Sequence, residues 1–162
     1  MEARPYLVLD LLPGVAAVDR TGIRVARTTD LPAMAAVMAD AYRGTVDDEG
    51  EDPPAALREL EATATGAHGP ALEHAWLVYE DDAGLSAAVV CTRWQGRPLV
   101  AYAFTHPSRQ RRGISRRLLL SAAGELARAG EAQLSLIVTR RNPAHELYLR
   151  IGFAERPWPA GT

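Results

Sequence analysis

The stretch LVAYAFTHPSRQRRGISRRLLLSAAGELARAG, residues 99–130, contains the pattern of a strand, a basic turn and a helix in direct succession. Residues 99–104 are apolar and β-prone, as a buried strand requires, and Pro107 ends the strand because proline cannot donate to a sheet. From Ile114 onward, apolar residues recur at every fourth position, which is the spacing of one helix face. Gly130 is typical of a helix C-terminus. The stretch therefore predicts a strand–turn–helix unit.

The turn between that strand and helix, residues 108–115, combines one glycine with three arginines. A helix N-terminus presents unpaired backbone N–H groups and a partial positive charge. Gly113 lets the backbone approach a ligand closely, and the arginines add positive potential. We therefore predict a phosphate-binding loop, with a solvated basic turn or a nucleic-acid contact as the alternatives.

Composition places the chain among ordinary globular proteins. Its 162 residues are 48% hydrophobic and 23% charged, which suits one domain. No apolar run approaches the ~20 residues of a membrane helix, and the N-terminus lacks the pattern of a signal peptide, so we expect a cytoplasmic protein without a membrane partner. Cys91 is the single cysteine, so no internal disulfide and no metal site are expected. The formal net charge of −2 argues against nucleic acid as a partner.

Further elements flank the strand–turn–helix unit. The other expected strands are residues 23–27, 75–79, 85–94, 133–139 and 153–157. The other expected helices begin near Thr29-Asp30, at Ala55 and at Asn142-Pro143, where capping residues or proline suit a first turn. Residues 6–12 are apolar and predict either a strand packed on the domain edge or a segment that meets a partner subunit, so a homodimer is a hypothesis.

Taken together, this order of elements resembles the GNAT family of acetyl-CoA-dependent N-acetyltransferases. Two segments carry the resemblance. THP at 105–107 followed by QRRGIS at 110–115 looks like the family's acetyl-CoA pyrophosphate loop, and NPAHELYLRIGF at 142–153 looks like its Asn…Leu-Tyr…Gly-Phe segment. The resemblance covers residues 23–153.

The resemblance implies a fold and a domain arrangement. The fold is α+β in three α/β/α layers, with a mixed, mostly antiparallel sheet of about six to seven strands and about four helices. One domain would cover residues 1–162, with residues 1–20 as an N-terminal extension.

The resemblance also implies acetyl-CoA as the acetyl donor and a primary amine of a small molecule or peptide as the acceptor. The backbone around Phe104 and Thr105 would bind the pantetheine arm, and Tyr148 would protonate the departing thiolate. A tyrosine hydroxyl, with its reference pKa near 10, can donate at neutral pH, although a buried core tyrosine is the alternative. The remaining implied cofactor contacts are Gln110, Arg111, Arg112, Gly113, Ile114, Ser115, Arg116 and Asn142. For Asn142, capping of the last helix is a sufficient structural explanation.

Two residues depart from the family pattern. Ser115 stands where the loop usually has Gly or Ala, so its hydroxyl either crowds the phosphate or donates to it. Ile137 stands where the ribosomal-protein N-terminal acetyltransferases of the family have a glutamate, which argues against that particular activity.

The residue that takes the proton of the amine is left open. An alkyl amine with a reference pKa near 10.4 is mostly charged at neutral pH, so its attack requires a base. His106, just after the strand, has a suitable side chain, with a turn histidine as the alternative. Asp47, Asp48 and Glu49 lie in an acidic loop, residues 44–54, where the family places its acceptor-binding wall; a solvated connection is the alternative.

Two other functions compete with acetyl transfer. A non-catalytic acyl-CoA-binding sensor or interaction module would keep the phosphate loop and lack an acceptor site. A nucleic-acid binder would use the arginines from Arg109 to Arg117, but the net charge of −2 and the absence of basic residues between Arg58 and Arg93 weaken that hypothesis.

Overall fold

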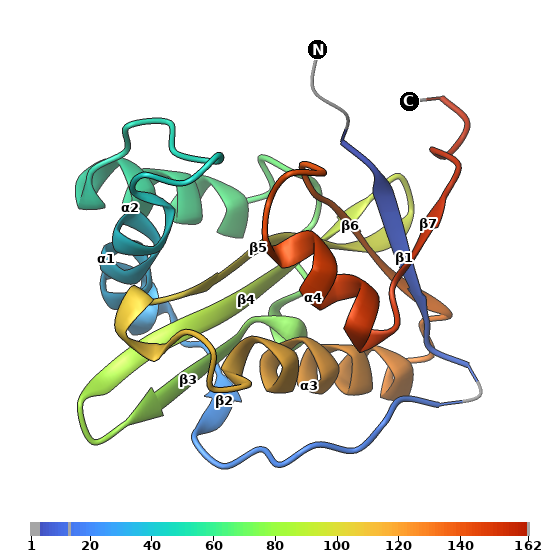
Figure 1. Cartoon of the computed structure of the whole chain (residues 1–162), viewed down its shortest axis with the longest axis horizontal. Coiled ribbons are helices and arrows are strands. Elements are labelled where there is room, and N and C mark those ends of the chain that lie inside the picture. The colour runs from blue at the N-terminus through green and yellow to red at the C-terminus, as the bar shows by residue number, and fades with distance from the viewer. Residues whose placement is uncertain (1–3, 13, 162) are drawn as a thin grey trace.

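The computed structural model describes residues 4–12 and 14–161, and within them a single mixed sheet carries helices on both faces (Figure 1). Its seven strands lie in the order β2-β3-β4-β5-β6-β1-β7. The strands are β1 (Tyr6–Asp10), β2 (Ile23–Val25), β3 (Leu77–Asp81), β4 (Gly84–Trp94), β5 (Arg97–Thr105), β6 (Gln133–Ile137) and β7 (Ala154–Arg156). The α-helices are α1 (Leu31–Tyr42), α2 (Pro53–Ala64), α3 (Ile114–Arg128) and α4 (Ala144–Ile151). Neighbouring strands are antiparallel except β5 and β6, which confirms the expected α+β fold with its mostly antiparallel sheet.

Strand β4 shows how both faces of the sheet are buried. Ala87, Val89 and Cys91 belong to the apolar core under α3, whereas Ala88 and Val90 belong to the core under α1 and α2. Successive side chains of a strand point to opposite faces, so burial on both sides requires the nearly continuous apolar run of this segment.

Several element boundaries differ by a few residues from the expected ones, and for β3 and α2 a local turn and a cap explain the difference. Strand β3 begins at Leu77, since a 3₁₀ turn, η2 (Glu73–Ala75), takes up the residues before it. Helix α2 begins at Pro53, because the side chain of Asp52 accepts a hydrogen bond from the Ala55 N–H at 3.0 Å and caps the helix. No helix in the described part of the chain is long and apolar enough to cross a bilayer.

Strand β1 fills a slot inside the sheet. It pairs with β6 on one side and β7 on the other, and Leu7 and Leu11 are fully buried. The expectation of a strand on the domain edge is therefore wrong, because β7 lies outside β1. Shortly before β2, Arg20 bonds Glu125 of α3 at 2.6 Å.

Strands β5 and β6 separate soon after they meet. Their parallel pairing has the register Leu99↔Ser135, after which β5 continues to Thr105. On its other side, β5 pairs with β4 through a register shift that places Val90 opposite Tyr102 and Cys91 opposite Val100, which is a β-bulge. A bulge bends its strand and re-aims backbone groups. The second half of β5 therefore leaves β6 and ends at the turn that leads into α3.

Candidate functional site

The turn before α3 has the backbone conformation of an anion-binding loop. Gly113 has φ +77° and Arg111 has φ +66°, so both lie in the left-handed region, and such turns can direct successive N–H groups to one side. No side chain caps the N-terminus of α3 among the described residues. A Cβ added at Gly113 would meet no atom within 4 Å, so the loop opens onto free space there. The first-turn amides of α3 are therefore available to a phosphate.

Thr105, the last residue of β5, holds this loop in place. Its hydroxyl lies 2.9 Å from the Ser115 hydroxyl, and its carbonyl accepts a hydrogen bond from the Gln110 side chain at 3.3 Å. The Ser115 hydroxyl thus bonds back to the strand, and Gln110 fastens the turn to β5. The Thr105 carbonyl, one of the backbone groups implied to bind pantetheine, already has this partner.

The arginines of the loop divide into two groups. Arg109 pairs with Asp81 at 3.1 Å, and Arg117 donates to the Asp19 carbonyl at 2.8 Å, so both side chains have structural partners. The side chains near the open face of the loop that are exposed are Arg111, Arg112 and Arg116. Ile114 is buried in the core and contributes only its backbone to the loop surface.

The side chain of Asn142 makes two hydrogen bonds, which connect the start of α4 with the acidic loop. Its side-chain oxygen accepts from the Ala144 N–H at 2.9 Å, as expected for a helix cap. Its amide nitrogen donates to Asp47 Oδ2 at 2.7 Å. The acidic loop between α1 and α2 is therefore fastened across the site to the beginning of α4.

Tyr148, on α4, is partly buried and packs edge-on against Phe153 with ring centroids 6.0 Å apart. Burial, and secondarily the Asp47 carboxylate, raises the pKa of Tyr148 to about 12. The hydroxyl is therefore fully protonated at neutral pH and able to donate a proton.

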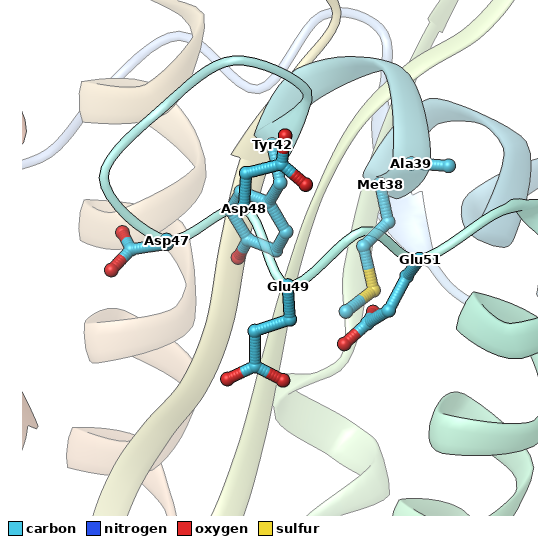
Figure 2. Close-up of a pocket in the computed structure, with 7 residues that line it drawn as sticks. All are labelled: Met38, Ala39, Tyr42, Asp47, Asp48, Glu49 and Glu51. Carbon is cyan, nitrogen blue, oxygen red and sulfur yellow. The ribbon is translucent and has the colours of Figure 1, made fainter.

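A depression at the end of α1 is lined by residues of that helix and of the acidic loop (Figure 2). Its lining residues are Met38, Ala39, Tyr42, Asp47, Asp48, Glu49 and Glu51. In Figure 2 the carboxylates of Glu49 and Glu51 extend in the same general direction, whereas that of Asp47 points away from them. Burial, then the neighbouring Glu49, raises the pKa of Glu51. The depression thus concentrates negative charge beside a tyrosine.

Tyr42, on the last turn of α1, connects this depression with β5. Its ring lies 6.2 Å from that of Phe104, near the end of β5. Burial first, then nearby Tyr148 and Asp47, raises the pKa of Tyr42. From the sequence, Tyr42 was one of several aromatic residues that could line a pocket or pack in the core, and Glu51 was part of the acidic loop; neither was given a chemical role.

The structure gives His106 and Asp48 local roles. His106 Nδ1 accepts a hydrogen bond from the Ser108 N–H at 3.1 Å and caps a 3₁₀ turn, η3 (Pro107–Arg109), while its Nε2 lies 3.4 Å from Asp40. Asp48 accepts from two backbone N–H groups of its own loop, which hold the pKa of its carboxyl below its usual range. Glu49 is exposed at the rim of the depression. Of the four candidate bases, Asp47 is the one whose side chain bonds Asn142, two residues before α4.

Within the part of the chain that the structure describes, no group of three or more His, Cys, Asp or Glu side chains is placed to hold a metal ion. Cys91 is buried in the core, and burial raises the pKa of its thiol to about 12.

The structure combines a mixed sheet in which β5 and β6 separate, an open turn at the start of α3 and a protonated tyrosine on α4. This combination is that of an acyltransferase-type domain. Residues 71–155 match the family model described as "Acetyltransferase (GNAT) domain", and the chain belongs to this family. None of the curated proteins compared with the chain matches it.

Solved structures share this fold at low sequence identity. A GCN5-related N-acetyltransferase from Sphaerobacter thermophilus has a TM-score of 0.74 and 21% identity over 94% of this chain and 48% of its own, so the chain spans about half that protein's length. A GNAT family acetyltransferase from Brucella melitensis, in complex with acetyl-CoA, has a TM-score of 0.61 and 21% identity over 83% of this chain and 90% of its own. The Escherichia coli ribosomal-protein-S18-alanine N-acetyltransferase has a TM-score of 0.62 and 25% identity over 83% and 78%, respectively.

Proposed function

We propose that the protein transfers an acetyl group from acetyl-CoA to a primary amine of a small molecule or peptide, by direct attack in a ternary complex. The observation that carries this proposal is the position of Tyr148. Its protonated hydroxyl lies near Asp47 and Tyr42, and Tyr42 packs against Phe104 on the last part of β5, one residue before Thr105 fastens the anion loop. A proton donor and a phosphate-binding loop therefore flank the end of the same strand.

The residues at the loop fit the donor. The backbone amides of the turn and of the first turn of α3, from Arg111 to Arg116, and the open space at Gly113 suit a pyrophosphate, and the exposed Arg111, Arg112 and Arg116 match its charge. We assign the pantetheine arm to the backbone around Phe104 and Thr105, with Phe104 more available because Gln110 already bonds the Thr105 carbonyl. The bound acetyl-CoA supplies an activated thioester.

The chain's own residues would then manage the protons. A loop carboxylate takes one proton from the acceptor ammonium, and the resulting amine attacks the thioester, so that an N–C bond forms and a C–S bond breaks. Tyr148 gives its proton to the departing sulfur and regains one from the nitrogen as the amide forms. The carboxylate passes its proton to water, so the sum is one amide, one thiol and one released proton.

The acidic loop supports a cationic acceptor. Asp47, Asp48 and Glu49 place negative charge beside the end of β5, where an ammonium would be attracted and its proton received. Ile137, on β6, is apolar and cannot take a proton. We therefore propose that the base comes from the loop and do not propose acetylation of ribosomal-protein N-termini.

Calorimetry of acetyl-CoA binding, followed in the same sample by measurement of thiol release against a panel of amines, tests the proposal. We expect saturable binding and release that depends on one class of amine. Binding without release from any amine would favour a non-catalytic acyl-CoA-binding module, and the absence of binding would contradict the assignment of the loop from Gln110 to Ser115.

One acyltransferase domain over residues 1–162, a cytoplasmic location and a homodimer remain proposals. Fractionation of cells and sedimentation of the purified chain test the last two.

A further inference from the structure

Asn142 joins two parts of the site that the sequence keeps far apart. Its side chain bonds Asp47, 95 positions earlier, with the amide nitrogen 2.7 Å from Oδ2. An ionised carboxylate has no proton to donate and can act only as an acceptor, so the amide nitrogen is the donor in this pair. The amide oxygen is engaged by the Ala144 N–H at 2.9 Å, which fixes the orientation of the same side chain. Asn142 therefore presents its donor to Asp47 from a helix end.

The three candidate carboxylates of the acidic loop differ in their hydrogen-bond partners and in the direction of their side chains. Asp48 turns back onto the N–H groups of Gly44 and Gly50, each at 2.8 Å, and so stabilises the loop itself. Glu49 is exposed, and in Figure 2 its carboxylate extends in a different direction from that of Asp47.

The negative charge of Asp47 acts on tyrosines of two different helices. It raises the pKa of Tyr42 at the end of α1 and the pKa of Tyr148 on α4. The hydrogen bond to Asn142 places the Asp47 carboxylate next to the segment that leads into α4, the helix that carries Tyr148. A base that acts on the amine must lie close to the proton donor of the thiolate, since both act on groups attached to the same carbonyl carbon.

We infer that Asp47 is the loop carboxylate that receives the proton of the acceptor ammonium, and that Asn142 is a positioning residue that holds Asp47 beside Tyr148. This inference rests on the proposed function and names its base. The transfer is a single proton from nitrogen to Asp47, which leaves a carboxylic acid that later loses the proton to water. Without the bond to Asn142, the Asp47 carboxylate would be free to move, and a displacement of about 1 Å at a reacting group can reduce turnover about 10²-fold.

A charge-swap experiment separates positioning from simple structural support. Asn142→Asp keeps an oxygen that can cap α4 through the Ala144 N–H, but it replaces the donor with a second carboxylate facing Asp47. We expect kcat to fall about 10–100-fold with little change in the acetyl-CoA dissociation constant, because the cofactor loop lies on α3. Asp47→Asn is expected to lower kcat about 10²–10⁴-fold, as the loss of an acid–base group does.

The double variant, Asp47→Asn with Asn142→Asp, restores an amide–carboxylate hydrogen bond with the roles exchanged. We expect it to recover the melting temperature of the wild type. Its kcat should stay as low as in Asp47→Asn, since the carboxylate is now at position 142 and no longer in the acidic loop. Recovery of kcat to within about threefold of the wild type would show that the pair only supports the structure and would overturn the inference.

Three further outcomes are informative. If Asn142→Asp weakens acetyl-CoA binding and leaves kcat intact, Asn142 is a cofactor contact and not a positioning residue, which also overturns the inference. If the wild type is inactive with every amine, the proposed function fails and the role of Asp47 fails with it. If the wild type is active and the double variant is too, the inference alone fails.

Discussion

The hydroxyl groups of Thr105 and Ser115 lie 2.9 Å apart, so the end of β5 is joined directly to the first turn of α3. Gln110 adds a second connection by donating to the Thr105 carbonyl. These bonds hold the anion loop in shape before any ligand arrives, which reduces the conformational entropy that binding must remove. They also explain why a serine is accommodated where the related loop usually has glycine or alanine.

Gly113→Ala should weaken acetyl-CoA binding more than it weakens the fold. Alanine at φ +77° is strained by about 1–2 kcal/mol, and its methyl group would enter the open space in front of the loop amides. We expect the dissociation constant for acetyl-CoA, measured by calorimetry, to rise at least about tenfold, which corresponds to 1.4 kcal/mol.

Gly130→Ala is the matched control for this substitution. Gly130 also has a positive φ, +89°, and a Cβ there would also meet no atom within 4 Å, but it lies at the opposite end of α3. The two variants should lose similar stability in thermal melts, while Gly130→Ala keeps its affinity for acetyl-CoA. Equal affinities in both variants would contradict the anion-loop assignment.

Tyr148→Phe should lower kcat about 10²–10⁴-fold, because it removes the proton donor and leaves the ring packing against Phe153. With a raised pKa of about 12, the Tyr148 hydroxyl keeps its proton well into alkaline solution, so its deprotonation does not limit turnover at neutral pH. Tyr79→Phe, which removes a hydroxyl on β3, serves as the control in steady-state assays. An undiminished kcat in Tyr148→Phe would remove the tyrosine from the mechanism.

Two adjacent leucines should respond very differently to truncation. Leu11 has 0% of its surface exposed and Leu12 has 70%. Leu11→Ala is expected to lower the free energy of unfolding by about 2–5 kcal/mol, as the loss of a buried leucine side chain does, whereas Leu12→Ala should lie within about 0.5 kcal/mol of the wild type. Urea unfolding curves measure both, and similar losses in the two variants would contradict the placement of this segment.

Leu12→Ser also tests the homodimer without unfolding the chain. An exposed leucine is available to a partner, so sedimentation equilibrium should show a lower association constant in Leu12→Ser if the N-terminal segment forms a dimer contact. An unchanged mass at all concentrations would remove this segment from the interface.

Stability should fall in acid through Asp30. Its hydrogen bonds with Arg24, at 2.7 and 2.9 Å, and then the Arg27 N–H, lower the pKa of this carboxyl from 3.8 to about 2. A depressed folded-state pKa stabilises the fold above pH 3.8, and the contribution, about 2 kcal/mol, disappears as the pH falls through about 2. Denaturation curves between pH 2 and 5 give the free energy of unfolding as a function of pH. In Asp30→Asn and in Arg24→Gln, this free energy should depend much less on pH than in the wild type. A slope that persists in both variants would assign acid sensitivity to other carboxylates.

Local pattern was sufficient for much of the fold. The strand–turn–helix of residues 99–130 and the helix capped by Asn142 lie where they were expected, because strand propensity, helix periodicity and caps act between residues close in sequence. The mostly antiparallel sheet could also be predicted, because the order of the elements resembles that of a known family and the resemblance implies the family's topology. Boundaries shifted by a few residues wherever a turn such as Glu73–Ala75 competed with a strand.

Part of the candidate site could be predicted from the sequence. The glycine, the arginines and Tyr148 were recognisable as residue types in a spaced pattern. The partners of Ser115 and His106 were not, because a hydroxyl or an imidazole has several feasible hydrogen bonds and only the folded backbone decides among them. Tyr42 gave no local signal beyond an aromatic residue at a helix end.

The sequence by itself determined the elements and the order of the chemical groups along the chain. Tertiary structure decided that β1 enters the slot between β6 and β7, that β5 and β6 part after Leu99, and that Asp47 meets Asn142. Each of these relationships joins segments that are distant in sequence, and such contacts form only when the packing of the whole sheet and its helices brings them together. The base of the proposed reaction is specified by such a contact, between residues 95 positions apart.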